Sequence, residues 1–347
     1  MHVTQELINW YNGVKRNLPW RHTTDAYTIW LSEIILQQTR VEQGLPYFNR
    51  FLEKYPTVTH FAAAPEDDIL KLWQGLGYYS RGRNMLKTAI QVQQQFGGTF
   101  PTSYEQLIKL KGIGEYTAAA IASFSANEAR AVLDGNVYRV LSRYMGISEP
   151  IDSTTGKKIF KQAAADFLDR QNPATHNQAM MELGAIVCKP KNPACGTCPF
   201  NLGCYAFLHN ATTALPVKLK KVKIKERHFN YFLIEKDDKI LINKRQEGDI
   251  WANMYDLPMI ETEGPTTLDE LLLLPAMLRT YGSNLIIKKI FLPVKHVLTH
   301  QHLYIRFIVL EKKPLTIDKN WVFIEVENLK KMALPKPIFI FLDNFLN

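Results

Sequence analysis

The chain contains little cysteine and no long apolar run, and these two shortages exclude whole classes of protein. Only four cysteines occur among its 347 residues, and all of them lie between positions 188 and 204. This clustering excludes a disulfide framework spread over the fold and favours metal binding in a reducing compartment. No apolar stretch approaches the ~18 residues that a membrane span needs. The N-terminal residues lack the apolar core of a signal peptide, so we expect a cytoplasmic protein, nucleoid-associated in a bacterium, that contacts no membrane.

Acidic residues are also in short supply relative to basic ones. Lys and Arg number 42 against 33 for Asp and Glu, which leaves a formal net charge of +9. A positive excess of this size favours a polyanionic partner such as nucleic acid and carries no information about the fold. The sequence has no internal repeat and no self-complementary surface pattern, so a monomer is expected.

The composition and the secondary-structure pattern of the sequence change once, near residue 212, and this change predicts a multidomain protein. Residues 1–212 carry successive helical patterns, residues 213–228 are Lys-rich and predict a linker, and residues 229–347 mix strand and helix patterns. The first half is therefore expected to be all-α and the second α+β. Thr4 and Asp25 are the predicted N-caps of the first two helices. The predicted strands cover 229–235, 239–244, 285–291, 303–310 and 321–326, with Asp237 and Asp238 as a hairpin turn.

A glycine hairpin at residues 110–114 lies between two short helical patterns, 103–109 and 115–124. Gly112 and Gly114 lack Cβ atoms, so the backbone can turn tightly and bring its N–H groups close to an anion. The second helix begins at this turn and directs its free N–H groups and its positive dipole end the same way. Such a hairpin suits a phosphate group. An ordinary connector between two helices fits the hairpin alone equally well.

The cysteines have the spacing C-x6-C-x2-C-x5-C and predict a soft metal centre. Zinc sites built from four cysteines usually show two C-x2-C pairs, and only one is present here. An iron–sulfur cluster suits the uneven loop better, while zinc stays open as the alternative. Lys189 and Lys191 lie between the first two cysteines and add positive charge that can help to hold DNA. The four predicted ligands are Cys188, Cys195, Cys198 and Cys204.

Together, the hairpin, the aspartate Asp134 twenty residues beyond it and the cysteine spacing resemble the helix-hairpin-helix DNA glycosylases. This superfamily includes endonuclease III and the MutY family of adenine glycosylases. The resemblance covers residues 1–212 and implies a six-helix module at about 22–134 and a cluster module from about 1–21 and 135–212. It also implies that the cysteines hold a [4Fe–4S] cluster.

Tyr116 decides which chemistry the resemblance implies. The glycosylase–lyases of the superfamily carry a lysine at the matching position, two residues after the second glycine, and this lysine forms a Schiff base with the sugar. A tyrosine has no amine. The chain is therefore expected to remove a base without cutting the strand.

Glu33 and Asp134 are the two candidate catalytic carboxylates. Apolar neighbours in the predicted second helix should raise the pKa of Glu33, whereas the helix N-terminus at Asp134 should favour its ionised form. Two carboxylates with separated pKa values suit an acid and a stabilising anion, as in glycoside hydrolysis. From the residues alone, a solvated helix residue and a plain N-cap fit as well. The MutY resemblance implies catalysis by both, with Tyr116 and Asn136 orienting groups around the sugar.

Further positions match the superfamily's contacts with DNA. The run SEIILQQTRV supplies Gln37, Gln38 and Thr39, of which Gln38 is expected to fill the space left by an extruded base. The run GLGYYSR supplies Leu76 and Tyr78 as residues that insert between bases, although both could instead be core residues. The resemblance places Arg21 near the base pocket.

The second half resembles the Nudix fold but lacks the Gly-x5-Glu-x7-Arg-Glu-x-x-Glu-Glu type of box that holds magnesium in Nudix hydrolases. We therefore expect a recognition domain without hydrolase activity, which in the MutY family checks for 8-oxoguanine. Thr299 and His300 match its recognition loop. The nearby histidines 296, 300 and 302 also suggest a metal site, but no carboxylate or cysteine accompanies them. Residues 253–258 depart from the family's usual motif, so the contacts of this half are less closely specified.

These observations predict a base-excision glycosylase that flips out and removes adenine opposite 8-oxoguanine or guanine in double-stranded DNA. A related glycosylase that removes thymine or uracil is the first alternative, and the Nudix-like half argues against it. A non-catalytic iron–sulfur protein that surveys DNA is the second, and the two carboxylates argue against that. Replication or repair proteins as partners cannot be read from the sequence.

Overall fold

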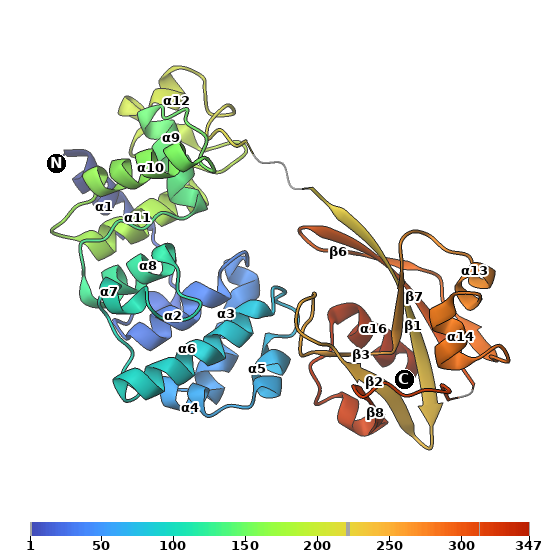
Figure 1. The fold of residues 1–347 in the computed structure, drawn as a ribbon. Coiled ribbons are helices and arrows are strands. Elements are labelled where there is room, and N and C mark those ends of the chain that lie inside the picture. The colour runs from blue at the N-terminus through green and yellow to red at the C-terminus, as the bar shows by residue number, and fades with distance from the viewer. Residues whose placement is uncertain (1, 220–222, 312, 347) are drawn as a thin grey trace. The chain divides into compact units, whose positions relative to one another are not determined.

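The computed structural model describes all residues except 1, 220–222, 312 and 347, and it divides the chain into two compact units. The first unit comprises Met1–Ala64 and Asn84–Lys220, and the second comprises Pro65–Arg83 and Lys221–Asn347 (Figure 1). Among the described residues, no helix combines the length and the apolar character that crossing a membrane requires.

The first unit is built from helices and short helical turns. Its elements are α1 (His2–Val14), η1 (Pro19–Arg21), α2 (Ala26–Ile35), α3 (Val41–Lys54), α4 (Val58–Ala62), the main part of α6 (Ser80–Phe96), α7 (Tyr104–Leu107), α8 (Glu115–Ala126), α9 (Gly135–Met145), α10 (Thr154–Phe167), α11 (Pro173–Ile186), η2 (Cys195–Thr197), η3 (Asn201–Gly203) and α12 (Tyr205–Leu208). The expectation of an all-α half is thereby confirmed.

Helix α2 is buried on nearly every side, which makes it the central element of this unit. Nine of its ten residues are buried, as expected for a helix that is apolar all round. The indole of Trp30 packs against the rings of Phe61 and Phe100, with centroid distances of 5.6 and 5.1 Å. Asp25 caps the helix by accepting a 2.8 Å hydrogen bond from the backbone N–H of Thr28, as predicted. The predicted cap at Thr4 is wrong, because α1 begins at His2.

The glycine hairpin joins α7 to α8, and its two glycines have different reasons to be there. Gly112 has a φ of +77°, and a Cβ atom on it would lie 2.8 Å from the Cβ of Asn84 on α6. Gly114 is the N-cap of α8 with an extended backbone (φ −94°, ψ 177°), and no atom lies within 4 Å of a Cβ built there. Backbone geometry and the close approach of α6 therefore require glycine only at Gly112.

A separate hydrophobic core holds α1, α9, α10 and α11 together. Leu7, Leu141, Phe160 and Leu183 are each fully buried in it. Helices α9 and α11 approach closely, because a Cβ atom on Gly184 would lie only 2.5 Å from the Cβ of Asn136. This contact places the N-terminus of α9 beside α11.

The second unit contains a mixed sheet and helices, so the expectation of an α+β half is confirmed. Strand β1 pairs with β7 in parallel and with β2 and β4 in antiparallel fashion; β5 and β6 flank β7, and β3 and β8 flank β2. The strands are β1 (Lys225–Lys236), β2 (Lys239–Lys244), β3 (Tyr255–Asp256), β4 (Met259–Thr262), β5 (Ile287–Ile290), β6 (Val294–Val297), β7 (Gln301–Leu310) and β8 (Trp321–Glu325). The helices are α5 (Glu66–Trp73), α13 (Leu268–Leu272), α14 (Pro275–Tyr281), α15 (Val326–Leu329) and α16 (Lys336–Leu346).

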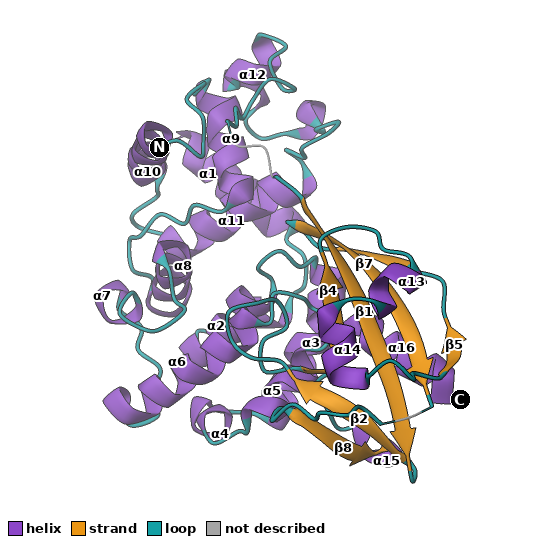
Figure 2. Ribbon diagram, turned by 45° about the vertical axis from the view of Figure 1, so that its right-hand side comes forward, coloured by secondary structure: helices purple, strands orange, loops and turns teal. Residues whose placement is uncertain are grey.

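Helices cover both faces of this sheet (Figure 2). Phe232 of β1 packs in one core with Met277 and Tyr281 of α14. On the other face, the ring of Phe307 of β7 stacks on Phe341 of α16 at a centroid distance of 3.8 Å. The side chains of successive strand residues point to opposite faces, which explains why β1 and β7 read as continuous apolar runs.

Two features of the second half differ from the sequence expectation. Strand β1 begins at Lys225, inside the range predicted as linker, because Lys225 to Ile234 pair residue by residue with β7. The short strands β3, β4 and β6 were not predicted, since two to four residues give too little alternation to detect. The hairpin turn at Asp237 and Asp238 is confirmed, and both residues have positive φ.

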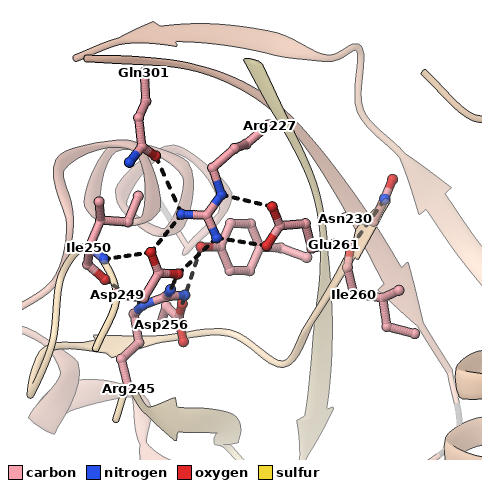
Figure 3. Close-up of polar contacts among 10 residues, drawn as sticks. Arg227, Asn230, Arg245, Asp249, Ile250, Asp256, Ile260, Glu261 and Gln301 are labelled. Carbon is pink, nitrogen blue, oxygen red and sulfur yellow. Dashed lines mark hydrogen bonds and ion pairs between the residues drawn. The ribbon is translucent and has the colours of Figure 1, made fainter. Parts of the chain in front are cut away.

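Arginines and carboxylates form a half-buried network beside β1 (Figure 3). The guanidinium of Arg227 contacts Asp249 and Glu261, each through two hydrogen bonds of 2.6–2.8 Å. Arg245 donates to Asp249 and to the fully buried Asp256. These carboxylates are thus engaged by guanidinium groups. No local sequence pattern indicates the network, because its members are spread over 35 positions of the chain from 227 to 261.

Replacing Gly112 by alanine is expected to lower the free energy of unfolding of the first unit by about 2 kcal/mol, because alanine resists the positive φ and would contact Asn84. Gly114→Ser is the matched control, since serine suits an N-cap and has open space there. Urea unfolding followed by circular dichroism measures both variants. Equal stability of Gly112→Ala and the parent would contradict this account of the hairpin.

Candidate active site

A cavity of about 600 Å³ in the first unit brings together all four predicted catalytic residues. Its lining includes Glu33 from α2, Tyr116 from α8, and Asp134 and Asn136 from the start of α9. Arg21 of η1 also lines it. The two candidate carboxylates, which are about a hundred positions apart in the sequence, therefore share one cavity.

Glu33 is a buried acid with a single strong hydrogen-bond donor beside it. Its side chain lies on the buried helix α2, the residue is 8% exposed, and the hydroxyl of Tyr116 donates to its Oε2 at 2.6 Å. Burial raises the pKa of Glu33 to about 7, and the negative charge of Asp134 adds to this shift. The Tyr116 hydrogen bond and the charge of Arg21 oppose it. The sequence expectation of a raised pKa is confirmed.

Asp134 caps α9 and is held by donors on its own helix. Its Oδ1 accepts from the backbone N–H of Val137 at 2.7 Å, and its Oδ2 accepts from the amide of Asn136 at 2.8 Å. Burial nevertheless raises the pKa of Asp134, and these hydrogen bonds only oppose the rise. The expectation that the helix N-terminus would dominate is therefore wrong, because the carboxylate lies inside the cavity rather than at the surface.

Arg139, which the sequence reading missed, connects this carboxylate to the cysteine loop. Its Nη2 donates to the side-chain oxygen of Asn136 and to the carbonyl of Gly184, both at 2.8 Å, and its Nε donates to the carbonyl of Cys188 at 2.7 Å. Asn136 in turn donates to Asp134. Arg139 lies three residues after Asn136 on α9, so the helical i, i+3 spacing could have indicated their contact.

The four cysteines surround a small cavity of about 20 Å³ of their own. All four are free and half-buried. Arg143, which is 3% exposed, lines this cavity and donates to the Sγ of Cys188 at 3.4 Å and to the carbonyl of Lys189 at 2.7 Å. No group of three or more His, Cys, Asp or Glu among the described residues is spaced to hold a metal ion. By donor chemistry rather than by spacing, four thiols around one cavity with the Arg143 guanidinium beside them suit a soft metal centre such as an iron–sulfur cluster.

The predicted DNA-contacting residues beyond α2 lie at the rim of the large cavity. Gln38 is exposed and has a φ of +55°, which a non-glycine side chain rarely adopts. The Gln37 amide donates to the hydroxyl of Thr117 on α8 at 3.3 Å, and Thr39 donates to the Gln37 carbonyl at 3.2 Å. These contacts hold the strained turn in place and leave Gln38 free of the core.

In the second unit, two residues predicted separately meet each other. The hydroxyl of Tyr78 donates to the hydroxyl of Thr299, 221 positions further along the chain. Tyr78 is 43% exposed with a φ of +47°, and Thr299 and His300 are exposed. Leu76 is 7% exposed, as the core alternative describes, and its insertion into DNA stays a prediction.

Lys189 and Lys191 are both exposed on the loop that follows the first cysteine.

The model of the HhH-GPD superfamily of base excision DNA repair proteins matches residues 31–164, and the NUDIX domain model matches residues 230–344. An adenine DNA glycosylase of Buchnera aphidicola subsp. Baizongia pistaciae is 35% identical over 341 residues, which are 96% of this chain and 94% of the relative.

The chain belongs to the adenine DNA glycosylase family. The human adenine DNA glycosylase is 41% identical over 209 residues, 58% of this chain and 38% of that one. Among solved structures, a thermostable thymine-DNA glycosylase matches 59% of this chain and 95% of its own with 26% identity and a TM-score of 0.55. An endonuclease III–DNA covalent intermediate matches 60% of this chain at 19% identity and a TM-score of 0.52, which supports the fold alone.

Glu33→Gln is expected to stabilise the protein above neutral pH. Because the folded-state pKa of Glu33 is about 7 and its ordinary value is 4.5, the buried carboxylate destabilises the fold at high pH and has no effect once both states are protonated. The variant should exceed the parent by about 3 kcal/mol in free energy of unfolding at pH 8, and by nothing below pH 4.

Chemical unfolding from pH 4 to pH 8 measures this difference. Glu53→Gln, at an exposed position on α3, is the control for a change of one surface charge. A pH-independent difference between Glu33→Gln and the parent would show that the Glu33 carboxyl does not titrate as a buried acid.

Proposed function

We propose that this protein removes adenine from duplex DNA, opposite 8-oxoguanine or guanine, and leaves the strand intact. The observation that supports this proposal best is the single cavity that holds a buried acid, Glu33, and a second carboxylate, Asp134. Membership of the adenine DNA glycosylase family supports adenine as the base. The cavity is reached only by a nucleotide that has left the helical stack, so base flipping comes first.

Glu33 serves as the acid for the departing base. With a pKa of about 7, a substantial fraction of Glu33 holds its proton near neutral pH, and a proton is needed on the adenine ring, at N7 by family resemblance, to make adenine a good leaving group. The hydroxyl of Tyr116 donates to Oε2 and so orients the carboxyl group. After the base has left, the same group can accept a proton from the attacking water.

Asp134 stabilises the electron-poor sugar while the glycosidic bond breaks. The transition state of such a reaction resembles an oxocarbenium ion, which an adjacent carboxylate stabilises by charge or by transient bond formation. The contacts from Val137 and Asn136 hold the Asp134 carboxylate in one orientation. Position 116 is a tyrosine and has no amine, so it cannot form the Schiff base through which the related lyases cut the strand.

The cysteine site would hold a [4Fe–4S] cluster through Cys188, Cys195, Cys198 and Cys204. Such a group, once bound, supplies a rigid anionic centre that fixes the loop carrying Lys189 and Lys191, which can contact the DNA backbone. Two arginines position the first cysteine: Arg143 donates to the sulfur of Cys188, and Arg139 donates to its carbonyl. The second unit would recognise 8-oxoguanine with Tyr78, Thr299 and His300.

Removal of thymine is the second candidate, favoured by the 26% identity of the helical part to a thymine-DNA glycosylase. Single-turnover excision on duplexes with adenine opposite 8-oxoguanine, adenine opposite guanine and thymine opposite guanine separates the two. We expect adenine release, fastest opposite 8-oxoguanine, and no trapping of the protein on DNA by borohydride. Glu33→Gln should bind the first duplex but release adenine at least about a hundredfold more slowly.

Three results would contradict the proposal in different ways. Thymine release would favour the second candidate, and no release from any duplex would favour a DNA-binding protein without catalysis. Near-normal excision by Glu33→Gln would remove Glu33 from the acid's role. Asp166→Asn, which neutralises an exposed carboxylate on α10, controls for the loss of one negative charge.

Metal analysis tests the cluster. We expect a brown protein with broad visible absorbance and about four iron and four sulfide per chain, and loss of this colour in Cys198→Ala. Thr197→Ala, next to that cysteine, should stay coloured. A colourless protein with one zinc per chain would contradict the cluster and support the alternative site.

A further inference from the structure

Glu182 is a fully buried carboxylate that the excision steps above do not use. It lies on α11, and its side chain is 0% exposed. The carboxylate accepts from the backbone N–H, the Nε and the Nη2 of Arg16 at 3.0, 2.8 and 2.6 Å, and from the Nη2 of Arg21 at 2.8 Å. The Glu182 carboxylate thus binds two arginines, and it binds Arg16 through both its backbone N–H and its guanidinium group.

These contacts hold the segment that joins α1 to α2. Arg16 begins this segment and Arg21 ends η1, and Arg21 also donates to the Arg16 carbonyl at 3.2 Å. The Arg21 guanidinium lies 5.5 Å from the centroid of the Tyr11 ring. A charge-assisted, bidentate contact of this kind fixes both the position and the plane of a guanidinium group.

Both guanidinium groups belong to a wall of the catalytic cavity. Arg16, Arg21 and Glu182 line the 600 Å³ cavity together with Glu33 and Asp134. Arg16 and Arg21 also line a neighbouring cavity of about 330 Å³. The two arginines therefore contribute to the lining of both cavities, so their positions affect the shape of the space that a flipped base would enter.

We propose that Glu182 is a positioning residue whose carboxylate fixes the guanidinium groups of Arg16 and Arg21 in the lining of the cavity that also holds Glu33 and Asp134. Its own partners are the two arginines, so it acts on the reaction through them. This inference rests on the proposed function, because the positioned groups matter only if Glu33 and Asp134 carry out base excision.

The charges around Glu33 determine how a substitution at Glu182 changes the pKa of Glu33. Glu33 is influenced by Tyr116 from α8, Asp134 from the start of α9 and Arg21 from η1, and Arg21 lowers its pKa. The arginine contacts hold the pKa of Glu182 at about 2, so it is ionised at working pH and balances part of the arginines' positive charge. Removing this anion should stabilise the Glu33 carboxylate, and removing Arg21 should destabilise it.

The two substitutions are therefore expected to shift the pH profile of excision in opposite directions. In Glu182→Gln, the alkaline midpoint of single-turnover adenine release should fall by about one pH unit. The rate at pH 5 should then stay within about twofold of the parent, while the rate at pH 8 falls about tenfold. In Arg21→Gln, the midpoint should rise. Glu182→Asp keeps the charge, and its midpoint should stay with the parent's.

A uniform loss of rate at all pH values in Glu182→Gln, with an unchanged midpoint, would overturn the inference and leave Glu182 a merely structural residue. Asp166→Asn is the matched control and should leave the profile unchanged. If Glu182→Gln does not fold, the opposite shift in Arg21→Gln and the parent-like profile of Glu182→Asp test the same wall; an unshifted Arg21→Gln midpoint would overturn it.

A direct titration keeps this test separate from activity. The carboxyl ¹³C signal of Glu33, identified by its absence in Glu33→Gln, should titrate at lower pH in Glu182→Gln than in the parent, and an unmoved midpoint would contradict the inference. If the parent releases no adenine from any duplex, the proposed function fails instead, and the titration still decides whether Glu182 controls the charge at Glu33.

Discussion

The burial of one carboxyl group in a helix that is buried on nearly every side is the constraint on which the rest of the site depends. Helix α2 is enclosed on nearly every side, and Glu33 is carried into that interior by the helix itself. An uncompensated charge there would be costly, so the group holds its proton up to about neutral pH. Tyr116 and Arg21 limit the shift, which leaves an acid that can both give up and regain a proton.

The other half of the chemistry depends on a chain of contacts along α9. Asp134 is oriented by Asn136, Asn136 by Arg139, and Arg139 reaches the backbone of Cys188. The close approach of α9 and α11 at Gly184 makes these contacts possible. A group bound by the cysteines would therefore stabilise the same backbone that orients Asp134, the proposed catalytic carboxylate, and would join cofactor binding to the geometry of the candidate site.

In the second unit, acidic side chains beside β1 pair with arginines. The carboxylates of Asp249, Asp256 and Glu261 are occupied by Arg227 and Arg245 (Figure 3). What this unit presents to its surroundings is instead a pair of hydroxyls, from Tyr78 and Thr299, that contact each other. The half-buried arginine network joins β1 to the segments that carry Asp249 and Glu261, and the exposed hydroxyls lie on loops, where binding residues are often found.

Local patterns in the sequence were sufficient for the division into helical and mixed halves, the hairpin and the turn at Asp237, because each depends on neighbouring residues. The apolar neighbours of Glu33 indicated the direction of its pKa shift, but the burial that causes the shift comes from the packing of α2 inside the unit. Local patterns were not sufficient where packing between distant segments decides. Asp134 lies in the cavity rather than in solvent, Leu76 is buried, and Arg139, Arg143 and Glu182 gain their roles only from partners on other helices. A pattern records which face of a helix is apolar, but the partner that meets a given polar side chain is set by how whole helices pack.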